Sequence, residues 1–335
     1  MISVVMPVYN AATTLPAALD SLTRQTSADW ELVAVDDGST DASGAILDAY
    51  AGRDRRLRIV STPHAGIVAA LNTALGVARG QVIARMDADD VCLPDRLERQ
   101  RRHLEEHPAL GLVASRVRFG GDRVAGGGYA RHVEWTNQQV THEQISLARF
   151  VESPLAHPSV MFRSDVARRW GGYASGDFPE DYELWLRWLE AGVRMEKLTE
   201  PLLVWNDSAA RLSRCDPRYA DSAFYRVKAG YLARWLARHN AHHPAVLLWG
   251  AGRISRRRAR HVLDEGVRIR AFIDVDPRKI GRVIHGCPVL DPGALPKAGT
   301  AFIVSFVRSR GAREAIEAHL RAAGYRPGVD YILAA

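Results

Sequence analysis

The sequence predicts an α/β protein, and three observations lead to that prediction. Short β-rich runs alternate with helical patterns over the first ninety residues, which indicates a parallel sheet. Acidic residues stand where these runs end, and open α/β sheets bind their ligands at that edge. A second strand–turn–helix pattern begins near residue 245, after the run His242, His243 and Pro244. We therefore expect one domain over 1–240, with 217–240 as a helical connection, and a second over 241–335.

The elements of the first domain are predicted in order from hydrophobic periodicity and cap residues. The first helix is expected around Leu15, Leu19 and Leu22, and another begins at Glu180, with Leu184, Trp185, Trp188 and Leu189 on its apolar face. The pattern weakens from about 115 to 150, where GGDRVAGGG predicts a loop or hairpin. The predicted strands span 2–9, 30–39, 57–62 and 81–90, and the helices between them span 41–53 and 67–80.

Composition and charge exclude several classes of protein. Of the 335 residues 47% are hydrophobic and 25% charged, which are globular proportions. No apolar run approaches the roughly 20 residues that span a bilayer, and no basic leader precedes the first apolar run. The three cysteines lie far apart and form no metal-ligand spacing. We expect a cytoplasmic protein without a disulfide framework.

The basic surplus lies in the second domain. The net charge is +7, and residues 241–335 contain 16 Lys or Arg against 8 Asp or Glu. This asymmetry predicts anionic partners near the second domain, including peripheral contact with an anionic membrane at its inner face. We expect no nucleic-acid partner.

Paired carboxylates at two strand ends predict a polar pocket. Asp87 and Asp89 belong to the run DADD, and Asp36 and Asp37 begin the run DDGSTD. Hard divalent cations such as Mg²⁺ or Mn²⁺ take carboxylate oxygens and are shared with substrate phosphates. Each run alone could be a helix cap, but the two together predict a site for a nucleotide and its phosphates.

A third acidic pair, Glu180 and Asp181, stands at the start of the helix EDYELWLRW. The helix dipole stabilises negative charge there, so the pair could simply cap the helix. A carboxylate held in that place could also act as a general base toward a hydroxyl. The residues alone leave both interpretations open.

Taken together, the ordered motifs resemble those of family 2 glycosyltransferases over about residues 1–215. The motifs are VVMPVYN, ELVAVDDGSTD, GIVAALNTAL, VIARMDADD, AHPSVMFRSDV with GGY, and EDYELWLR. The resemblance implies the GT-A nucleotide-diphospho-sugar transferase fold, a nucleotide-diphospho-sugar donor, most often UDP-linked, a divalent metal ion and inversion at the anomeric carbon. The Q-x-x-R-W motif and membrane spans of processive synthases are absent, so transfer of one or a few sugars is expected.

The resemblance also implies roles for individual residues. Asp181 would be the base that deprotonates the acceptor hydroxyl, with Glu180 beside it in the acceptor pocket. Asp89 would bind the metal beside the diphosphate, and Asp87 would face the ribose or the metal. Pro7 and Tyr9 would flank the nucleobase, and Asp36 would hydrogen-bond it, with Asp37 alongside. The segment LLVWNDSAARLSR would provide Arg211 and Ser213 as contacts to the diphosphate.

Two further residues are candidates on the acceptor side. His157 in AHPSVMF could hydrogen-bond a phosphate or the acceptor, although a lone histidine before proline is more often structural. Trp205 could stack on a sugar, although tryptophans are mostly core residues.

The second domain carries a partial dinucleotide-binding motif. Gly250 and Gly252 follow a strand and open a helix, Ser255 stands at the third glycine position, and Asp274 ends the next strand about 20 residues on. The wider run resembles the small Rossmann-like domain of bacterial sugar acyltransferases that binds nucleotide sugars. A nucleotide-sugar site, a docking module and a degenerate structural domain remain open here, whereas an oxidoreductase lacks a second catalytic constellation.

The sequence thus predicts an inverting, metal-dependent glycosyltransferase that moves a sugar to a glycan or lipid-linked acceptor. The alternative is a nucleotide-sugar-binding scaffold or regulatory protein of polysaccharide biosynthesis. A two-carboxylate hydrolase would leave DDGSTD and DADD without a role. A sugar nucleotidyltransferase would need a glycine-rich loop where VYNAATTLP stands.

Overall fold

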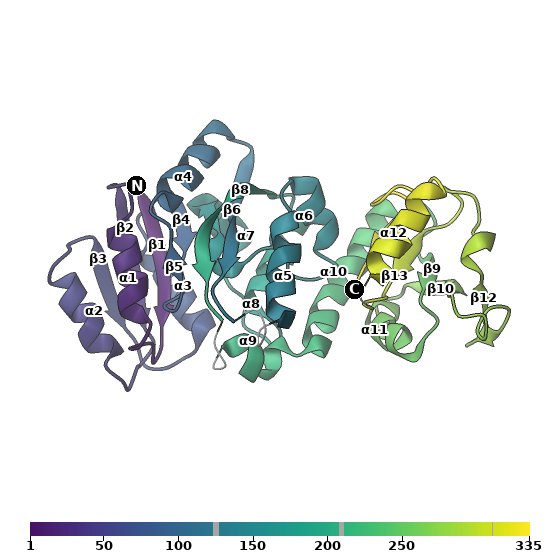
Figure 1. Ribbon diagram of the computed structural model, residues 1–335, viewed down its shortest axis with the longest axis horizontal. Helices are drawn as coiled ribbons and strands as arrows, with labels where there is room; N and C mark the ends of the chain where they lie inside the picture. The colour runs from purple at the N-terminus through teal and green to yellow at the C-terminus, as the bar shows by residue number, and fades with distance from the viewer. Residues whose placement is uncertain (123–126, 208–210, 310) are drawn as a thin grey trace. The chain divides into compact units, whose positions relative to one another are not determined.

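The computed structural model describes residues 1–122, 127–207, 211–309 and 311–335 (Figure 1). It contains two compact units, each with its own sheet and core. Unit 1 comprises residues 1–145, 154–176 and 180–216, and unit 2 comprises 146–153, 177–179 and 217–335. Parts of two motifs from the sequence, GGDRVAGGG and LLVWNDSAARLSR, lie outside the described residues at 123–126 and 208–210.

Unit 1 is built on an eight-stranded mixed sheet in the order β3-β2-β1-β4-β7-β6-β8-β5. Strands β1 to β4 are parallel, and β7 runs antiparallel to β4 and β6. The four predicted strands are found. The bounds are β1 (Ile2–Val8), β2 (Trp30–Asp36), β3 (Leu57–Ser61), β4 (Val82–Arg85), β5 (Val91–Cys92), β6 (Leu110–Phe119), β7 (Met161–Arg163) and β8 (Arg194–Trp205).

The core of unit 1 lies on both faces of this sheet. All seven residues of β2 are buried, as expected of a parallel strand covered on both sides. Successive side chains point to opposite faces, so Leu32 and Ala34 join one apolar cluster and Val33 and Val35 join the other. The second cluster also contains Trp185 and Trp188 of α8 (Glu180–Glu190), which confirms the predicted apolar face of that helix.

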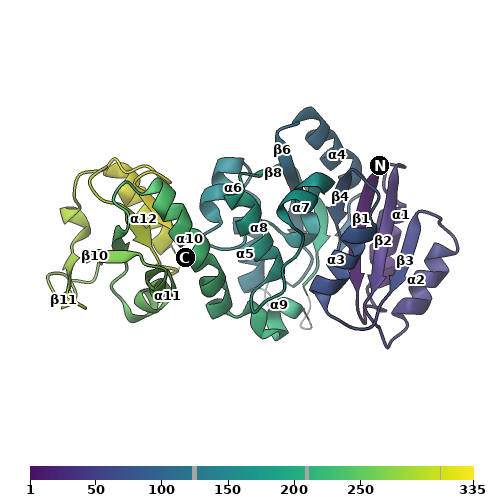
Figure 2. The same cartoon turned by 180° about the vertical axis from the view of Figure 1, so that it is seen from behind.

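Except for the last one, which follows β8, the helices around this sheet occupy the connections between its strands (Figures 1 and 2). None of the helices in the described ranges is long and apolar enough to cross a membrane. The bounds are α1 (Leu15–Thr23), α2 (Ser43–Ala51), α3 (Ile67–Val77), α4 (Arg96–Glu106), α5 (Gly127–Gln138), α6 (His142–Ala148), η1 (His157–Ser159), α7 (Ser164–Trp170), α8 (Glu180–Glu190) and α9 (Leu212–Cys215).

Unit 2 has a six-stranded sheet in the order β11-β12-β10-β9-β13-β14. Five strands are parallel, and their order from β12 to β14 is third, second, first, fourth and fifth along the chain. This is the order of a doubly wound sheet, whose ligands bind where the order reverses, between β9 and β13. The bounds are β9 (Ala245–Trp249), β10 (Arg268–Ile273), β11 (Val283–Ile284), β12 (Cys287–Leu290), β13 (Ile303–Ser305) and β14 (Tyr331–Leu333).

The helices of unit 2 include the one expected as a connection. Helix α10 belongs to unit 2 by its contacts, and the predicted linker at His242, His243 and Pro244 lies between α10 and β9. The bounds are η2 (Pro217–Tyr219), α10 (Asp221–His239), α11 (Arg253–Asp264), η3 (Pro292–Ala294) and α12 (Ala312–Ala322).

Candidate active site

The loops after β1 and β2 lie side by side, because Val8 is paired with Asp36 in the sheet. Pro7 is within β1, and Tyr9, directly after the strand, is 48% exposed. The Tyr9 ring stacks on His64, with centroids 4.1 Å apart and planes 23° apart. The arrangement presents an exposed aromatic surface at the carboxyl edge of the sheet.

Asp36 and Asp37 are buried and have local partners. Asp37 accepts hydrogen bonds from the N–H groups of Ala65 (2.8 Å) and Gly66 (2.9 Å), just before α3. Its Oδ2 also lies 2.9 Å from Nδ1 of His64, so it fixes the ring that stacks on Tyr9. Asp36 accepts from the Ser39 N–H at 3.0 Å. Asp37 thus holds the segment that enters α3, and its contacts are with residues before the first turn of that helix.

Two side chains of the DDGSTD run and that of Ser43, the first residue of α2, hold the loop after β1 by accepting hydrogen bonds from three of its backbone N–H groups. Ser39 Oγ accepts from Asn10 (3.0 Å), Ser43 Oγ from Ala11 (2.8 Å) and Asp41 Oδ2 from Ala12 (3.0 Å). A glycine is needed at position 38, where φ is 71°, because a Cβ there would lie 2.7 Å from the backbone nitrogen of His64. The conformation of the segment that carries Tyr9 therefore depends on the loop after β2.

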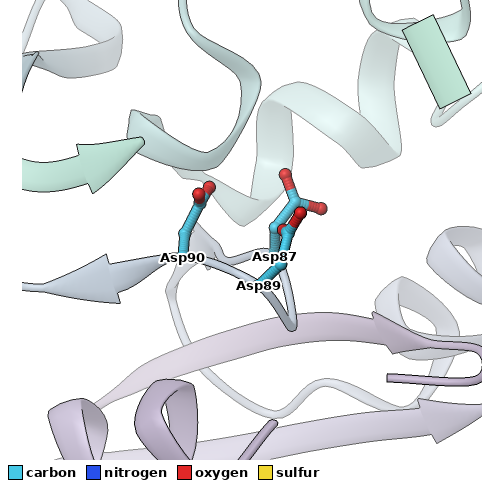
Figure 3. A group of neighbouring side chains, drawn as sticks. All are labelled: Asp87, Asp89 and Asp90. Atoms are coloured by element: carbon cyan, nitrogen blue, oxygen red, sulfur yellow. The ribbon is translucent and has the colours of Figure 1, made fainter. Parts of the chain in front are cut away.

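Asp87, Asp89 and Asp90 follow β4 and form an aspartate triad. One oxygen from each carboxylate lies within 4.8 Å of the others, and Figure 3 shows the three side chains rising from one loop to the same side. Burial and the neighbouring carboxylates raise the pKa of Asp89 to about 6 and that of Asp90 well above its usual range. Asn206 braces the loop, because its N–H donates to Asp90 Oδ1 (2.8 Å) and its Nδ2 to the Asp89 carbonyl (2.7 Å).

The triad fits a divalent cation. Three hard oxygen donors converge in it. The pKa values of Asp89 and Asp90 are raised because the carboxylates are buried and repel one another, and a bound cation would relieve that repulsion. Mg²⁺ and Mn²⁺ suit such donors. Sequence reasoning chose Asp87 and Asp89 for the metal, and Asp90 is the member of the triad that it did not select.

Two arginines lie beside the triad. Nη1 of the buried Arg85 is 2.6 Å from Oδ1 of Asp87. The Arg211 guanidinium lies over the rings of Tyr129 (4.7 Å) and Trp205 (5.0 Å). Although burial lowers the pKa of Arg211, Tyr129 and the triad raise it above its usual value. Ser213 is exposed on α9.

The acidic pair of α8 lies in the first turn of that helix. Burial and the neighbouring Glu180 raise the pKa of Asp181 to about 7, against the opposing effects of the Tyr182 N–H and the Arg85 charge. The Tyr182 N–H donates to Asp181 Oδ1 at 2.7 Å, and Glu180 is 2% exposed. A carboxylate whose pKa is near neutrality is suited to accept a proton.

The two acceptor-side candidates are both buried. His157 Nε2 lies 2.7 Å from the Tyr173 hydroxyl, and burial together with the Arg85 charge lowers the pKa of His157 well below its usual value. Trp205 is 6% exposed and packs on Tyr129 at 5.0 Å, so the described contacts give it a supporting role under Arg211.

Sequence reasoning missed several residues that the fold brings to this region. The signal for Arg85 was present, because an arginine that ends a buried strand two residues before an acidic run needs a partner there. No comparable local signal marks the others, whose partners are distant in sequence. The missed residues are Arg85, His64, Tyr129, Tyr173 and Asn206.

In unit 2 the glycine turn follows β9 as predicted. Gly250 has φ 109°, and a Cβ there would lie 2.7 Å from Ser255 Oγ. Gly252 is the N-cap of α11. Asp274 Oδ2 accepts from the Ala251 N–H (2.9 Å) and lies 3.1 Å from Lys279 Nζ. The carboxylate of the partial dinucleotide-binding motif is therefore already paired within the chain.

Comparison with known proteins agrees with the sequence motifs. The family model described as Glycosyl transferase family 2 matches residues 3–170, which is half of the chain. The O-antigen biosynthesis glycosyltransferase WbnJ of Escherichia coli is 31% identical over 231 residues, which cover 68% of this chain and 88% of WbnJ. The amylovoran biosynthesis glycosyltransferase AmsE of Erwinia amylovora is 33% identical over 213 residues, covering 61% of this chain and 75% of AmsE.

The fold is also found among solved structures. S. aureus TarS 1–349 in complex with UDP-GlcNAc aligns with a TM-score of 0.56 at 19% identity, covering 70% of this chain and 66% of that one. This likeness concerns the fold alone and bears out the expected GT-A fold. The family match and the identities to WbnJ and AmsE show that the chain belongs to glycosyltransferase family 2 and is a glycosyltransferase.

Proposed function

We propose that this enzyme is an inverting, metal-dependent glycosyltransferase that uses a nucleotide-diphospho-sugar, with a UDP-sugar as the first candidate. The observation that carries the proposal is the presence of two acidic groups in unit 1, each suited to a different part of the reaction. One is the aspartate triad, which is suited to a cation and a diphosphate, and the other is Asp181, whose pKa is raised to about 7.

The donor would lie along the carboxyl edge of the first sheet. Its base would rest against Tyr9, between the loops that carry Pro7 and Asp36, and Asp37 would act by fixing His64 beneath Tyr9. Arg211 and Ser213 would meet the diphosphate. Asp87 and Asp89, together with Asp90, would hold Mn²⁺ or Mg²⁺, which when bound neutralises charge on the diphosphate.

The chemical step is a single displacement. The acceptor hydroxyl oxygen forms a bond to the anomeric carbon while the bond from that carbon to the diphosphate oxygen breaks. The hydroxyl proton passes to Asp181, and the nucleoside diphosphate leaves with the bonding electron pair. Attack opposite the leaving group inverts the anomeric configuration. Glu180 keeps the pKa of Asp181 high enough to accept that proton.

The acceptor is proposed to be a hydroxyl of a glycan or a lipid-linked glycan. The relatives WbnJ and AmsE are named for O-antigen and amylovoran biosynthesis. His157 would shape this side of the site through its hydrogen bond to Tyr173, rather than by exchanging a proton. Trp205 would support Arg211.

A transfer assay tests the proposal directly. The full chain is incubated with a panel of UDP-, GDP- and dTDP-sugars, with glycan and lipid-linked acceptors, in Mn²⁺ or in a chelator. We expect a glycoside of inverted configuration from one donor class and only with the cation. Binding of donors without transfer to any acceptor would favour the scaffold alternative. Equal transfer with the chelator would contradict the metal dependence.

The second unit supports a further candidate role, as a second site for a nucleotide sugar. The glycine turn and the N-terminus of α11 lie where the strand order reverses. Because Asp274 is bonded to Lys279 and Ala251, we propose that phosphate groups meet the backbone N–H groups and Lys279 there. A docking module and a purely structural domain remain the competing interpretations.

The same unit is proposed to make peripheral contact with an anionic membrane on its cytoplasmic side. Arg253 and Arg257 are exposed on α11, and the apolar residues Ile254 and Val275 are 58% and 72% exposed. Each basic residue near such a surface contributes about 1 kcal/mol. Co-sedimentation with vesicles should increase with phosphatidylserine content, and equal binding to neutral vesicles would contradict this contact.

A further inference from the structure

Arg85 is a charged side chain held where charges are costly to bury. It is the last residue of β4 and is 1% exposed. Its backbone is fixed on both sides, because its N–H donates to the Val160 carbonyl (3.0 Å) and its carbonyl accepts from Arg96 Nη2 (2.7 Å). Burying an ion costs several kcal/mol unless partners compensate, so its surroundings should explain why it is there.

Its nearest charged partner is a member of the aspartate triad. Nη1 lies 2.6 Å from Oδ1 of Asp87. A contact of this kind limits the rotation of the carboxylate that would face the donor. Nη1 of Arg85 thereby acts on Asp87 from the interior of the sheet, whereas Arg211 approaches the triad from the segment after β8.

The Arg85 charge also acts on the other half of the site. It lowers the pKa values of Asp181 and Asp89 against the effect of burial, and it affects His157 and Tyr173 in the same direction. Groups from β4, α8 and the region of η1 thus share one buried cation. Without the Arg85 charge, less positive charge would offset the repulsion that Asp181 experiences from Glu180 and Asp87.

Two nitrogens of the Arg85 guanidinium, Nε and Nη1, are buried and make no hydrogen bond within the part of the chain that the structure describes. Nη1 has its charged contact with Asp87, whereas Nε has no such contact there. An unsatisfied buried donor costs about 1–3 kcal/mol, and such a group in a native site calls for a specific reason. An oxygen of the bound donor or acceptor could accept this hydrogen bond.

We propose that Arg85 is a positioning residue of the transfer reaction, whose guanidinium orients Asp87 toward the donor and supplies the buried positive charge shared by the aspartate triad and Asp181. This inference rests on the proposed function. It assigns Arg85 no proton transfer, and it makes the arginine two residues before the DADD run part of the site.

The test uses Arg85→Met, which removes the charge, and Arg85→Lys, which keeps the charge but not the planar fork. Arg163 provides the matched control. It lies in the same unit on β7, paired with Val82 at the opposite end of β4, and its Nε donates to the Leu110 carbonyl at 2.8 Å. Each variant is made in the full chain, its melting temperature is measured, and transfer is assayed over pH with the donor that the wild type uses.

For Arg85→Met we expect kcat to fall about 10- to 100-fold, as for other residues that orient a ligand-binding group, with acceptor KM within about twofold. The acid limb of the rate profile should move to higher pH, because the Asp181 carboxylate loses a stabilising charge while Glu180 and Asp87 still repel it. Arg85→Lys should recover part of kcat and return the limb toward the wild-type pH. Arg163→Met should leave kcat and the limb unchanged.

The inference is overturned if folded Arg85→Met keeps wild-type kcat and the wild-type acid limb, or if Arg163→Met produces the same losses. If Arg85→Met does not fold, Arg85→Lys decides, and unchanged kcat, donor KM and acid limb in that variant would overturn the inference. A wild-type chain that transfers no sugar, or an Asp181→Asn variant that is fully active, would instead count against the proposed function.

Discussion

The two sheets each carry candidate ligand-binding residues at the carboxyl ends of their parallel strands, but the charges at these two edges differ. In unit 1 that edge gathers carboxylates that repel one another, and burial raises the pKa values of Asp89 and Asp90. In unit 2 the corresponding carboxylate, Asp274, is neutralised by Lys279 and by a backbone N–H. The first edge is therefore suited to a cation from outside the chain in addition to Arg85 and Arg211, whereas the charge of Asp274 at the second edge is balanced by Lys279.

The largest effect expected from breaking this contrast is at Asp181. Replacing Asp181 with Asn should lower kcat by about 10²- to 10⁴-fold, since a general base contributes that much. The control is Asp165→Asn, in the first turn of α7, where the exposed carboxylate lies outside the triad and α8. Steady-state rates decide the matter, and an Asp181→Asn variant with more than a tenth of wild-type kcat would rule out this base.

Removal of the divalent cation should rank next. Chelation should reduce transfer about 100-fold or more, because charge stabilisation by a bound ion contributes several kcal/mol. Added Mn²⁺ or Mg²⁺ should restore it, and Asp89→Asn should respond only weakly to either ion. Glu200→Gln, on the exposed part of β8, is the control. Full activity in chelator-treated enzyme would refute the role of the triad.

The cation should also change how stability depends on pH. Asp89 binds a proton more tightly in the folded chain, since its pKa is raised to about 6. Its contribution to stability is therefore present at low pH and is lost as pH rises from about 4 to 6. A bound cation offsets this loss, so Mn²⁺ should raise the melting temperature more at pH 8 than at pH 5. An equal rise at both pH values would contradict this explanation.

The pH profile offers a milder test of the first edge. Because the pKa of Asp181 is raised to about 7, its carboxylate is protonated below that pH and cannot accept the acceptor proton. We expect kcat/KM to fall about tenfold per unit below pH 7. A profile that is flat down to pH 5 would show that a group with an ordinary carboxyl pKa, or no base, controls the step.

A smaller effect, on donor binding, is expected at Tyr9, where the nucleobase of the donor is proposed to rest. Tyr9→Ala should raise donor KM about three- to tenfold, as loss of an aromatic stacking contact costs about 0.5–1.5 kcal/mol, with less change in kcat. Trp170→Ala, 36% exposed at the end of α7, is the control for loss of an exposed aromatic ring. Unchanged donor KM in Tyr9→Ala would remove Tyr9 from the donor site.

The second edge is tested by binding rather than by rate. Calorimetry of the full chain with the preferred nucleotide sugar should give two sites per chain. Gly252→Asp keeps a good N-cap for α11 but places a carboxylate at the anion site, so it should give one site. Gly252→Asn, similar in shape and neutral, should retain some binding at the second. A single site in the wild type would leave unit 2 as a docking or structural domain.

The sequence was most informative where structure is local. Strands β1 to β4 were predictable because each is a short, mostly apolar run with several β-branched or aromatic residues, and helical patterns separate them. Strands β6 and β8 were not predicted as a pair, because β8 mixes charged residues and Pro201 and its register with β6 shifts three times. Such pairing is decided by distant contacts that no local pattern records.

The site shows the same division. The acidic residues were found because their types and strand-end positions are visible in the sequence. The burial of Trp205 under Arg211, the pairing of Asp274 with Lys279 and the place of Arg85 between the acidic groups were not. Each depends on which side chain occupies the space beside another, and only packing determines that.

The bonds from Ser39, Asp41 and Ser43 to the backbone after β1 have a consequence for engineering. The Tyr9 loop and the DDGSTD loop behave as a single exchangeable module, although a strand and a helix separate them along the chain. Swapping the first loop alone into a relative would strip it of its three acceptors. Donor preference should therefore be transplanted with both loops together, and libraries that vary Tyr9 should vary Ser39 and Ser43 in parallel.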